Sequence, residues 1–462
     1  MVELTLAGAA SAMGGRLTGN GGDVVPSGYS IDSRTLRRGD LFFALVGPNH
    51  DGHRFAGAAA DAGACALVAD REMDLPVPVL QVADTTRGLQ DLASHVRRRP
   101  DLKVVGITGS AGKTTAKEMT YAVVSGLSPA YRSQGNLNNL YGLPLSLLRM
   151  PASTHVAVLE MGMSYAGELR RLTRIARPDV GVLLNVGRAH LQNFVSVQEI
   201  AQAKAELFEE MGSGGTGIFN ADDELVRRVA DRFSGFTFTF AIDRDADLRA
   251  TRVTPEGFAG TRFRVVHGNA GIEGRIPFLG VHHVYNALAA LAVGYMLGGD
   301  LAGMMESLEQ IAPLPGRGER LQLPGDIRLI DDTYNSNPAA LRRAIGALVA
   351  AAPAGSRRVL VTGDMLELGD HGPAAHQEAG RHAAEARLEV VVAVGPLSEQ
   401  TAESAGEGGV ATVVHLPDSE EAAAAVADLV RPGDTVLVKG SRGMRMERVV
   451  QALQVRAAGA QG

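Results

Sequence analysis

The sequence predicts an α/β protein of several domains whose sheets are mainly parallel. Three observations support this fold class: the chain is long, short runs of Val, Ile and Leu alternate with Ala-rich helical patterns, and Pro- or Gly-containing segments interrupt the alternation twice. At 462 residues the chain is too long for one ordinary core, so roughly two to four domains are expected.

The expected strands are apolar along their whole length, because helices cover both faces of a parallel sheet. The stretch 251–277 differs, since its short alternating segments and turns indicate an antiparallel hairpin attached to the central sheet. The parallel strands are predicted at residues 102–107, 155–159, 180–185, 328–330, 358–362, 389–393 and 435–438.

Two segments mark the expected domain boundaries. The first is the basic, Pro-containing segment 97–101, and the second is the Pro- and Gly-rich segment 313–318. They divide the chain into an N-terminal domain over residues 1–98, a central domain over residues 99–313 and a C-terminal domain over residues 314–462.

The composition is that of an ordinary globular protein. Hydrophobic residues make up 45% and charged residues 21% of the chain, and the formal net charge of −6 gives no electrostatic reason to bind nucleic acid. The most apolar stretch, residues 284–299, is too short to span a bilayer and predicts a packed helix. A single cysteine, Cys65, cannot form an internal disulfide. We therefore expect a cytoplasmic protein with no integral membrane segment and no nucleic-acid partner.

The strongest local motif is a loop of small residues between a strand and a helix. The strand at 104–107 leads into Thr108-Gly109-Ser110-Ala111-Gly112-Lys113-Thr114-Thr115, and a helix is expected to begin near Lys113. Small residues let backbone N–H groups reach phosphate oxygens, and the helix N-terminus adds partial positive charge. Lys113 is expected to bridge the β- and γ-phosphates, and Thr114 to ligate Mg²⁺. Ile107 stands where the usual phosphate-loop motif has its first glycine, so only the shorter pattern Thr-Gly-x-x-Gly-Lys-Thr-Thr matches. The alternative is a glycine turn of purely structural origin.

Polar residues follow the next two predicted strands. Glu160 ends the strand at 155–159, where a carboxylate beside the phosphate loop is well placed to bind Mg²⁺. His190 follows the strand at 180–185, and this position makes it a candidate ligand rather than an ordinary histidine. Lys204 lies in an amphipathic helical pattern and, taken alone, is typical of a solvated helix lysine.

Together these motifs resemble the Mur ligase family, ATP-dependent enzymes that extend the peptide of a cell-wall precursor. The resemblance covers nearly the whole chain and keeps the order of the three domains. It is carried by the phosphate loop, Glu160, residues 185–190, Ala203-Lys204, residues 280–287, Gly316-Arg317 and Asp332.

Further blocks resemble the branch of this family that adds D-alanyl-D-alanine. A first-domain pair of blocks, 32–34 and 39–45, is similar to a uridine-binding region shared with the tripeptide-forming branch. The other blocks are residues 135–145 (Gly-Asn-Leu-Asn-Asn-Leu-Tyr-Gly-Leu-Pro-Leu), 331–338 (Asp-Asp-Thr-Tyr-Asn-Ser-Asn-Pro), 363–369 with His376, and 439–442.

The resemblance implies both an architecture and a reaction. The architecture is a central P-loop, parallel-sheet ATPase domain, a Rossmann-like C-terminal domain and a smaller N-terminal α/β domain that binds the UDP substrate. The reaction is ATP-dependent ligation of D-alanyl-D-alanine to UDP-N-acetylmuramoyl-tripeptide through an acyl phosphate, with release of ADP and phosphate. A monomer is expected, and the junction at 313–318 is a candidate hinge for closure on ATP.

The resemblance also implies a catalytic and nucleotide-binding set. Two Mg²⁺ sites are expected, one held by Thr114 and Glu160 and the other by His190 and carbamylated Lys204. The implied catalytic residues are Lys113, Glu160, His190 and Lys204, and ATP would be bound by Thr108 through Thr115 with Asn286 at the adenine, Arg317 at the phosphates and Asp332 at the ribose.

Two further groups of residues are assigned to the other substrates. Asn337 could equally cap a helix that starts at Pro338, and Lys439 and Arg442 could be ordinary loop charges. The D-alanyl-D-alanine cleft would involve Asn335, Ser336, Asn337, Lys439 and Arg442, and the UDP substrate would meet Ser33, Arg34, Phe43, Ala44 and His53.

Two other interpretations stay open. One is a ligase that adds a single amino acid, or a folylpolyglutamate synthase-like ligase, against which the block at 331–338 argues. The other is a P-loop switch or binding module that uses ATP only to change shape. Such a protein has no need of His190, Lys204 or a uridine-type first domain.

Overall fold

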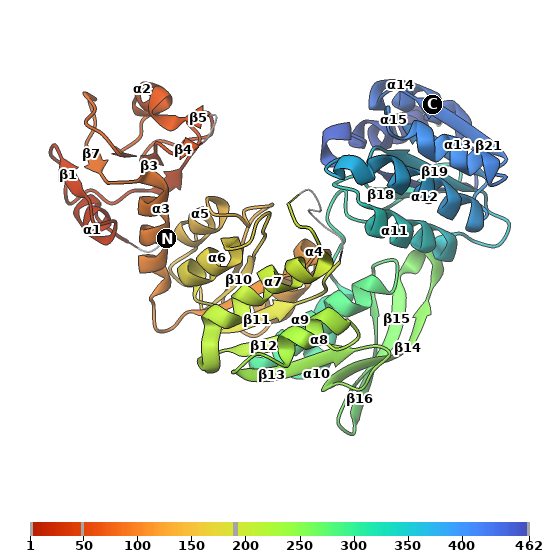
Figure 1. Cartoon of the computed structure of the whole chain (residues 1–462), viewed down its shortest axis with the longest axis horizontal. Helices are drawn as coiled ribbons and strands as arrows, with labels where there is room; N and C mark the ends of the chain where they lie inside the picture. Colours follow the sequence, from red (N-terminus) through yellow and green to blue (C-terminus); the bar gives the residue numbers. More distant parts are fainter. Residues whose placement is uncertain (1–2, 48–49, 188–192, 460–462) are drawn as a thin grey trace.

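The computed structural model describes residues 3–47, 50–187 and 193–459. Three lobes follow one another along the chain, each built on its own sheet (Figure 1). The α/β fold class predicted from the sequence is confirmed. The main sheets lie within residues 16–81, 103–276 and 319–439, so the predicted boundaries fall in the connections between sheets. The domain limits themselves stay predictions.

The N-terminal lobe contains a five-stranded sheet in the order β1-β7-β6-β3-β2. Only β1 is antiparallel to its neighbour, and the strands in the middle are fully buried. Its elements are α1 (Leu6–Ala12), β1 (Arg16–Thr18), β2 (Gly28–Ser30), β3 (Asp40–Phe43), β4 (Val46–Gly47), β5 (His50–Asp51), η1 (Gly52–Phe55), α2 (Ala56–Asp61), β6 (Ala66–Ala69), β7 (Val79–Gln81) and α3 (Thr85–Arg97).

The central lobe contains a nine-stranded sheet in the order β16-β15-β14-β13-β12-β11-β8-β10-β9. The strands from β9 to β14 pair in parallel, whereas β14, β15 and β16 pair antiparallel, as the sequence predicts for residues 251–277. Its strands are β8 (Lys103–Thr108), β9 (Ala130–Arg132), β10 (Val156–Glu160), β11 (Val180–Leu183), β12 (Thr216–Asn220), β13 (Phe236–Ala241), β14 (Leu248–Pro255), β15 (Thr261–His267) and β16 (Ala270–Ile276).

Helices cover both faces of this sheet, which explains why its central strands are apolar throughout. The apolar stretch at 284–299 forms most of α9, a helix buried against the sheet and α4. The helices are α4 (Lys113–Ser125), α5 (Gly142–Leu148), α6 (Glu168–Ala176), α7 (Val197–Met211), η2 (Gly212–Gly214), α8 (Glu224–Ala230), η3 (Gly257–Ala259), α9 (His282–Met296) and α10 (Leu301–Glu309).

The C-terminal lobe has a six-stranded sheet in the order β17-β18-β22-β19-β20-β21, parallel except for β17. Alternating strands and helices give this lobe the predicted doubly wound arrangement. Its elements are β17 (Glu319–Leu323), β18 (Ile327–Asp332), α11 (Pro338–Ala351), β19 (Arg358–Gly363), η4 (Gly369–His371), α12 (Gly372–Glu385), β20 (Val390–Val394), α13 (Glu399–Glu407), β21 (Thr412–Leu416), α14 (Ser419–Leu429), β22 (Thr435–Lys439), η5 (Arg442–Met444) and α15 (Glu447–Gly459).

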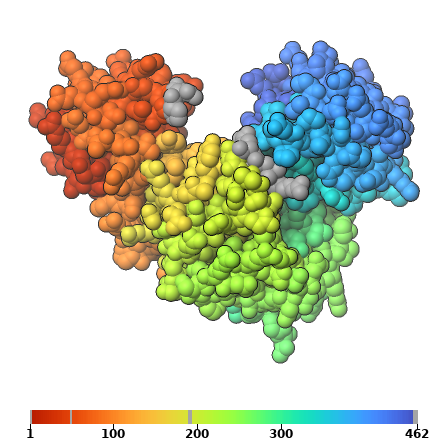
Figure 2. Space-filling model, in the orientation of Figure 1, coloured from red at the N-terminus to blue at the C-terminus, as the bar shows by residue number. Residues whose placement is uncertain are grey.

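Specific contacts join the central lobe to each of its neighbours. At the first junction, the guanidinium of Arg97 donates to the carbonyls of Ala176 and Arg177, both at 2.6 Å. At the second, η3 packs against α11, and Phe258 packs against the apolar core of the C-terminal lobe. The two outer lobes stand apart above the central one (Figure 2).

Among the residues that the structure describes, no helix has the length and apolarity needed to cross a lipid bilayer.

Candidate active site

The phosphate loop lies where β8 ends and α4 begins, in the middle of the central sheet. Neighbouring strands β10 and β11 flank β8, and the chain passes to both sides of it, so the loop occupies a topological switch point where ligands of such sheets bind. Gly112 has φ +85°, and a Cβ there would lie 2.6 Å from Oδ1 of Asn286. Glycine is therefore required at this position by both backbone conformation and space.

The loop after β11 braces the phosphate loop from one side. The side-chain amide of Asn185 accepts a hydrogen bond from the N–H of Ala111 at 2.9 Å and donates to its carbonyl at 3.0 Å. The hydroxyl of Ser110 donates to the carbonyl of Gly187 at 3.1 Å and accepts from its N–H at 2.9 Å. The backbone of the loop is thus held in place without any ligand.

Glu160 lies at the end of β10, directly beside the start of α4. The hydroxyl of Thr114 donates to Oε2 of Glu160 at 2.7 Å, and the pair is buried. The described residues contain no cluster of three or more His, Cys, Asp or Glu side chains. A hydroxyl and one carboxylate nevertheless fit Mg²⁺, which commonly takes one or two protein oxygens and completes its shell with substrate phosphates and water.

Three basic side chains lie near one another at the phosphate loop, with Lys113 close to Glu160, Arg317 and Lys204. Burial lowers the pKa of Lys113, Glu160 opposes that effect, and Arg317 of the C-terminal lobe adds to it. Burial and the nearby Lys113 ammonium lower the pKa of Lys204 well below its usual value. Lys113 donates to the carbonyl of Gly109 at 2.8 Å, and neither lysine forms an ion pair with a described residue. Lys113 and Arg317 can thus offer positive charge to a phosphate, whereas the lowered pKa of Lys204 favours its neutral amine.

His190, the other residue predicted to ligate the second metal ion, lies outside the described residues. Its predicted role stays a prediction.

The C-terminal lobe contributes Asp332 and Lys439 at the ends of the neighbouring strands β18 and β22. The buried ammonium of Lys439 donates to Oδ2 of Asp332 at 2.6 Å and to the carbonyl of Asn335 at 2.8 Å. Burial raises the pKa of Asp332, and Lys439 opposes this shift. Lys439 therefore holds together two segments of the cleft.

Arg317 and Tyr334 form a stacked pair at the same edge of the cleft. The guanidinium carbon of Arg317 lies 3.6 Å from the centre of the Tyr334 ring, a cation–π geometry that fixes a long side chain. Arg442 is more distant, 5.9 Å from the same ring, and is mostly exposed. Tyr334 thus fixes the position of Arg317, whose charge is close enough to Lys113 to lower the pKa of that lysine.

The other residues predicted for this cleft have distinct environments. Asn337 caps α11 by accepting from the N–H of Ala340 at 2.8 Å, which was one of its two predicted roles. Asn335 is exposed, and its side chain accepts from the N–H of Ser336 at 2.9 Å. The hydroxyl of Ser336 is buried and has no hydrogen-bond partner among the described residues.

Asn286, which is predicted to meet the adenine, is buried on α9, one turn after His283. The two side chains lie 3.4 Å apart, and burial and Arg343 lower the pKa of His283 to about 3. The ring is therefore neutral at physiological pH.

The residues predicted to meet the UDP substrate lie at one edge of the N-terminal sheet. Ser33 and Arg34 follow β2, while Phe43 ends the parallel neighbour β3 and Ala44 follows it. Arg34 is largely exposed and pairs with Asp32 at 2.7 Å. Phe43 and Ala44 are fully buried, backbone included, so the structure leaves neither residue accessible to a ligand. His53 is also buried, with Nδ1 2.7 Å from Oδ1 of Asp51.

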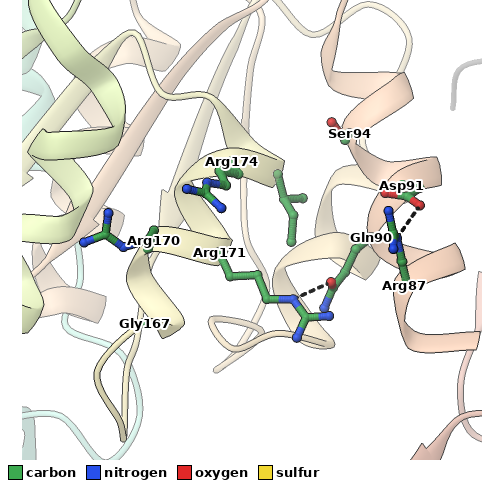
Figure 3. Close-up of a pocket in the computed structure, with 9 residues that line it drawn as sticks. Arg87, Gln90, Asp91, Ser94, Gly167, Arg170, Arg171 and Arg174 are labelled. Carbon is green, nitrogen blue, oxygen red and sulfur yellow. Dashed lines mark hydrogen bonds and ion pairs between the residues drawn. The ribbon is translucent and has the colours of Figure 1, made fainter. Parts of the chain in front are cut away.

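A large surface hollow lies away from these residues, between α3 and α6 (Figure 3). Its volume is about 490 Å³, and several arginines line it. Their charges are largely compensated: Arg170 and Arg174 pair with Glu210, Arg87 pairs with Asp91, and Arg171 donates to Gln90. This hollow is a polar groove at a lobe junction and not the nucleotide site.

Sequence reasoning gave no individual role to three residues that organise the site. Asn185 and Asn138 stand within quoted blocks, but nothing in the sequence shows which asparagine of a block faces inward. Tyr334 precedes Asn335, and its ring stacks against the guanidinium of Arg317. The burial of Lys204 could have been predicted from the sequence. Ile200, Ala203 and Leu207 share its face of α7, so that Lys204 lies on the apolar side of the helix.

The fold and the site together define an ATP-dependent ligase of three domains. Three family models match the chain: "Mur ligase family, catalytic domain" over residues 26–130, "Mur ligase middle domain" over 107–294 and "Mur ligase, glutamate ligase domain" over 316–442. The chain belongs to the Mur ligase family.

Individual relatives match over almost the whole length. The UDP-N-acetylmuramoyl-tripeptide--D-alanyl-D-alanine ligase of Escherichia coli (strain K12) is 34% identical over 98% of this chain and 99% of its own. The crystal structure of MurF from Acinetobacter baumannii superposes with a TM-score of 0.90 at 31% identity, covering 98% of this chain and 99% of that one. MurF ligase from Thermotoga maritima in complex with ADP has a TM-score of 0.83 at 29% identity, with 94% and 98% coverage.

Proposed function

We propose that this protein joins D-alanyl-D-alanine to UDP-N-acetylmuramoyl-tripeptide and converts ATP to ADP and phosphate. The observation that carries the proposal is the phosphate loop with the buried Thr114–Glu160 pair beside it and with Lys113 and Arg317 as its nearby cations. The relatives that match over nearly the whole chain bear the name of this activity.

The reaction needs two anions to approach each other, because a carboxylate oxygen of the tripeptide must attack the γ-phosphorus of ATP. That attack forms an acyl phosphate and releases ADP. The amine of D-alanyl-D-alanine then attacks the carbonyl carbon, phosphate leaves, and an amide remains. Lys113 and Arg317 would offset the negative charge of the phosphates, and the braced phosphate loop would fix the γ-phosphate for attack.

Thr114 and Glu160 would hold the Mg²⁺ that accompanies ATP, since both present oxygen atoms beside the phosphate loop. Bound Mg²⁺ would neutralise phosphate charge and polarise the transferred group. The structural neighbour with bound ADP supports nucleotide binding by this fold.

Lys204 is proposed to act as a carbamate, completing a second metal site with His190. Its amine is buried, has no ion-pair partner among the described residues and has a lowered pKa, so the neutral form that reacts with carbon dioxide is favoured. The carbamate would supply an anionic oxygen ligand in place of a buried cation.

The other two substrates are assigned to the lobes on either side of the central one, D-alanyl-D-alanine to the C-terminal lobe and the uridine end of the tripeptide substrate to the N-terminal lobe. D-alanyl-D-alanine would enter beside Asn335, Ser336 and Arg442, where the unpartnered hydroxyl of Ser336 supports a polar ligand contact after rearrangement. Lys439 would shape this pocket through Asp332 and Asn335 rather than by direct contact. The uridine end of the tripeptide substrate would meet the loops after β2 and β3, near Arg34.

The decisive experiment is a coupled assay with ATP and Mg²⁺. ADP should form only when both UDP-N-acetylmuramoyl-tripeptide and D-alanyl-D-alanine are present, and mass spectrometry should detect the pentapeptide. Tripeptides ending in meso-diaminopimelate and in lysine should be compared. Product from single D-alanine or from a folate would favour another ligase of the family, and ATP turnover without any ligated product would favour a switch.

Two properties accompany this proposal. The UDP-linked substrate and the single cysteine favour the cytoplasm, and the family resemblance favours a monomer. Light scattering during gel filtration measures the second directly.

A further inference from the structure

The two carboxylate oxygens of Glu160 have different partners. Oε2 accepts from the hydroxyl of Thr114 at 2.7 Å, on the side of the phosphate loop. Oε1 accepts from the side-chain amide of Asn138 at 2.7 Å, on the side of the loop between β9 and α5. Because an ionised carboxylate only accepts hydrogen bonds, the NH₂ of Asn138 must be the group that faces it.

Asn138 is itself held on two sides. The backbone carbonyl of Asn138 accepts a hydrogen bond from the N–H of Gly162 at 2.8 Å. The backbone N–H of Asn138 donates to the carbonyl of Asn136 at 2.7 Å. A Cβ at Gly162 would lie 3.0 Å from Cγ and Oδ1 of Asn138, so the amide rests against the bare backbone of Gly162. The amide therefore has little freedom to turn away from Glu160.

The segment that carries Asn138 is anchored by a buried lysine. Lys117 is 1% exposed, and its ammonium donates to the carbonyl of Ser133 at 2.7 Å. The hydroxyl of Ser133 in turn accepts from the N–H of Glu160 at 3.2 Å. Both the backbone and the side chain of Glu160 are thus fixed by this one loop.

We propose that Asn138 is a positioning residue that holds Oε1 of Glu160 and leaves Oε2 alone to face the metal ion. This inference rests on the proposed function only in that it assigns Mg²⁺ to Thr114 and Glu160. A carboxylate that offers only one oxygen, here the Oε2 that Thr114 also contacts, binds in the monodentate mode that the strict octahedral shell of Mg²⁺ accommodates. Ca²⁺ readily accepts both oxygens of one carboxylate, so the fixed amide favours Mg²⁺ over Ca²⁺.

The test is binding of ADP to Asn138→Ala by isothermal titration calorimetry in the presence of Mg²⁺, Ca²⁺ or EDTA. With Oε1 released, Glu160 can offer both oxygens to Ca²⁺, whereas Mg²⁺ still takes only one of them. The preference for Mg²⁺ over Ca²⁺ in ADP binding should therefore fall about tenfold, within the range seen when a partner of a metal ligand is removed. In EDTA, which removes both metal ions, Asn138→Ala should bind ADP with the same affinity as the wild-type protein. This result would also show that the nucleotide site of the variant is folded.

The matched control is Asn139→Ala, in the neighbouring residue. Asn139 accepts from the N–H groups of Tyr141 and Gly142 at the start of α5, and none of its hydrogen bonds reaches Glu160. Asn139→Ala should keep the wild-type preference. If Asn138→Ala does not fold, Gly162→Ala displaces the same amide by steric contact and should lower the preference in the same direction.

An unchanged preference in Asn138→Ala, or an equal loss in Asn139→Ala, would overturn the inference. Its failure is distinguishable from that of the proposed function. A wild-type protein that makes pentapeptide while Asn138→Ala keeps its preference refutes only the positioning role. A wild-type protein that binds Mg²⁺ and ADP, responds to Asn138→Ala and makes no pentapeptide refutes only the ligase assignment.

Discussion

Two lysines one turn apart on α4, the half-buried Lys113 and the buried Lys117, have different surroundings. At the phosphate loop, Lys113 and the nearby Lys204 form no ion pair with a described residue, and burial lowers the pKa of both. One turn further along α4, Lys117 pairs with Glu118 at 3.1 Å and donates to a backbone carbonyl. Burying an uncompensated charge is costly. The fold retains Lys113 where a ligand would bring the missing negative charge, and the lowered pKa of Lys204 favours a neutral amine there.

The largest expected effect is that of Lys113→Ala. This change removes the charge that would face the β- and γ-phosphates, and phosphate release in the coupled assay should fall about a thousandfold, as for loss of a transition-state donor. Lys103→Ala is the control, because Lys103 is exposed and pairs with Asp179 at the other end of β8. Near-normal turnover in Lys113→Ala would remove the phosphate loop from the mechanism.

Lys204→Ala should follow, with a loss of about a hundredfold if a carbamate ligand is removed. Lys204→Glu places a carboxylate near the same point and should keep more activity than Lys204→Ala. The wild-type enzyme should lose activity in buffer free of carbon dioxide and regain it with bicarbonate, and ¹³C-labelled bicarbonate should give a carbamate signal in NMR. Full activity of Lys204→Ala contradicts the carbamate role.

Lys117→Met tests the compensated region and should act on stability. It leaves Glu118 with Arg132 as its remaining partner, and the free energy of unfolding should drop by about 3 kcal/mol, as when a buried ion pair is broken. Urea unfolding followed by circular dichroism measures this loss, with Lys103→Met as the exposed control. An equal and small change in both variants would mean that the buried pair does not stabilise the loop.

The smallest effect is expected at an exposed pair in the N-terminal lobe. Hydrogen bonds from Arg34 lower the pKa of Asp32 to about 2. Its stabilising contribution is therefore present above the ordinary carboxyl pKa of 3.8 and is lost as the pH falls toward about 2. In Arg34→Ala, NMR titration should show the Asp32 pKa returning toward 3.8, with little change in stability because solvent screens the pair. An unshifted titration would show that another group holds Asp32.

The fold could be read from the sequence because its signals are local. Parallel strands such as β8 and β19 have apolar, buried interiors, and the loop before Lys113 combines small residues with a helix start. The hairpin at 251–277 was recognisable from its alternation. Asn337 was recognisable as a cap because Pro338 follows it.

The site was less predictable because its contacts join distant segments. Asn138 and Glu160 are separated by a helix and a strand, and only packing decides that Asn138, not Asn136 or Asn139, meets the carboxylate. Lys439 looked like a loop charge, yet it ends a buried strand and pairs with Asp332. Such contacts depend on register between strands, which a single sequence does not specify.

The contact between η3 and α11 has a mechanical consequence. Phe258 packs into the C-terminal core, and a Cβ at Gly257 would lie 3.9 Å from the carbonyl of Ala351, the last residue of α11. The opposite end of α11 carries Asn337 and the loop that faces the cleft. This 14-residue helix is about 20 Å long and is held at its C-terminal end. A tilt of roughly 10° about that end would therefore move the loop at the other end by about 3–4 Å.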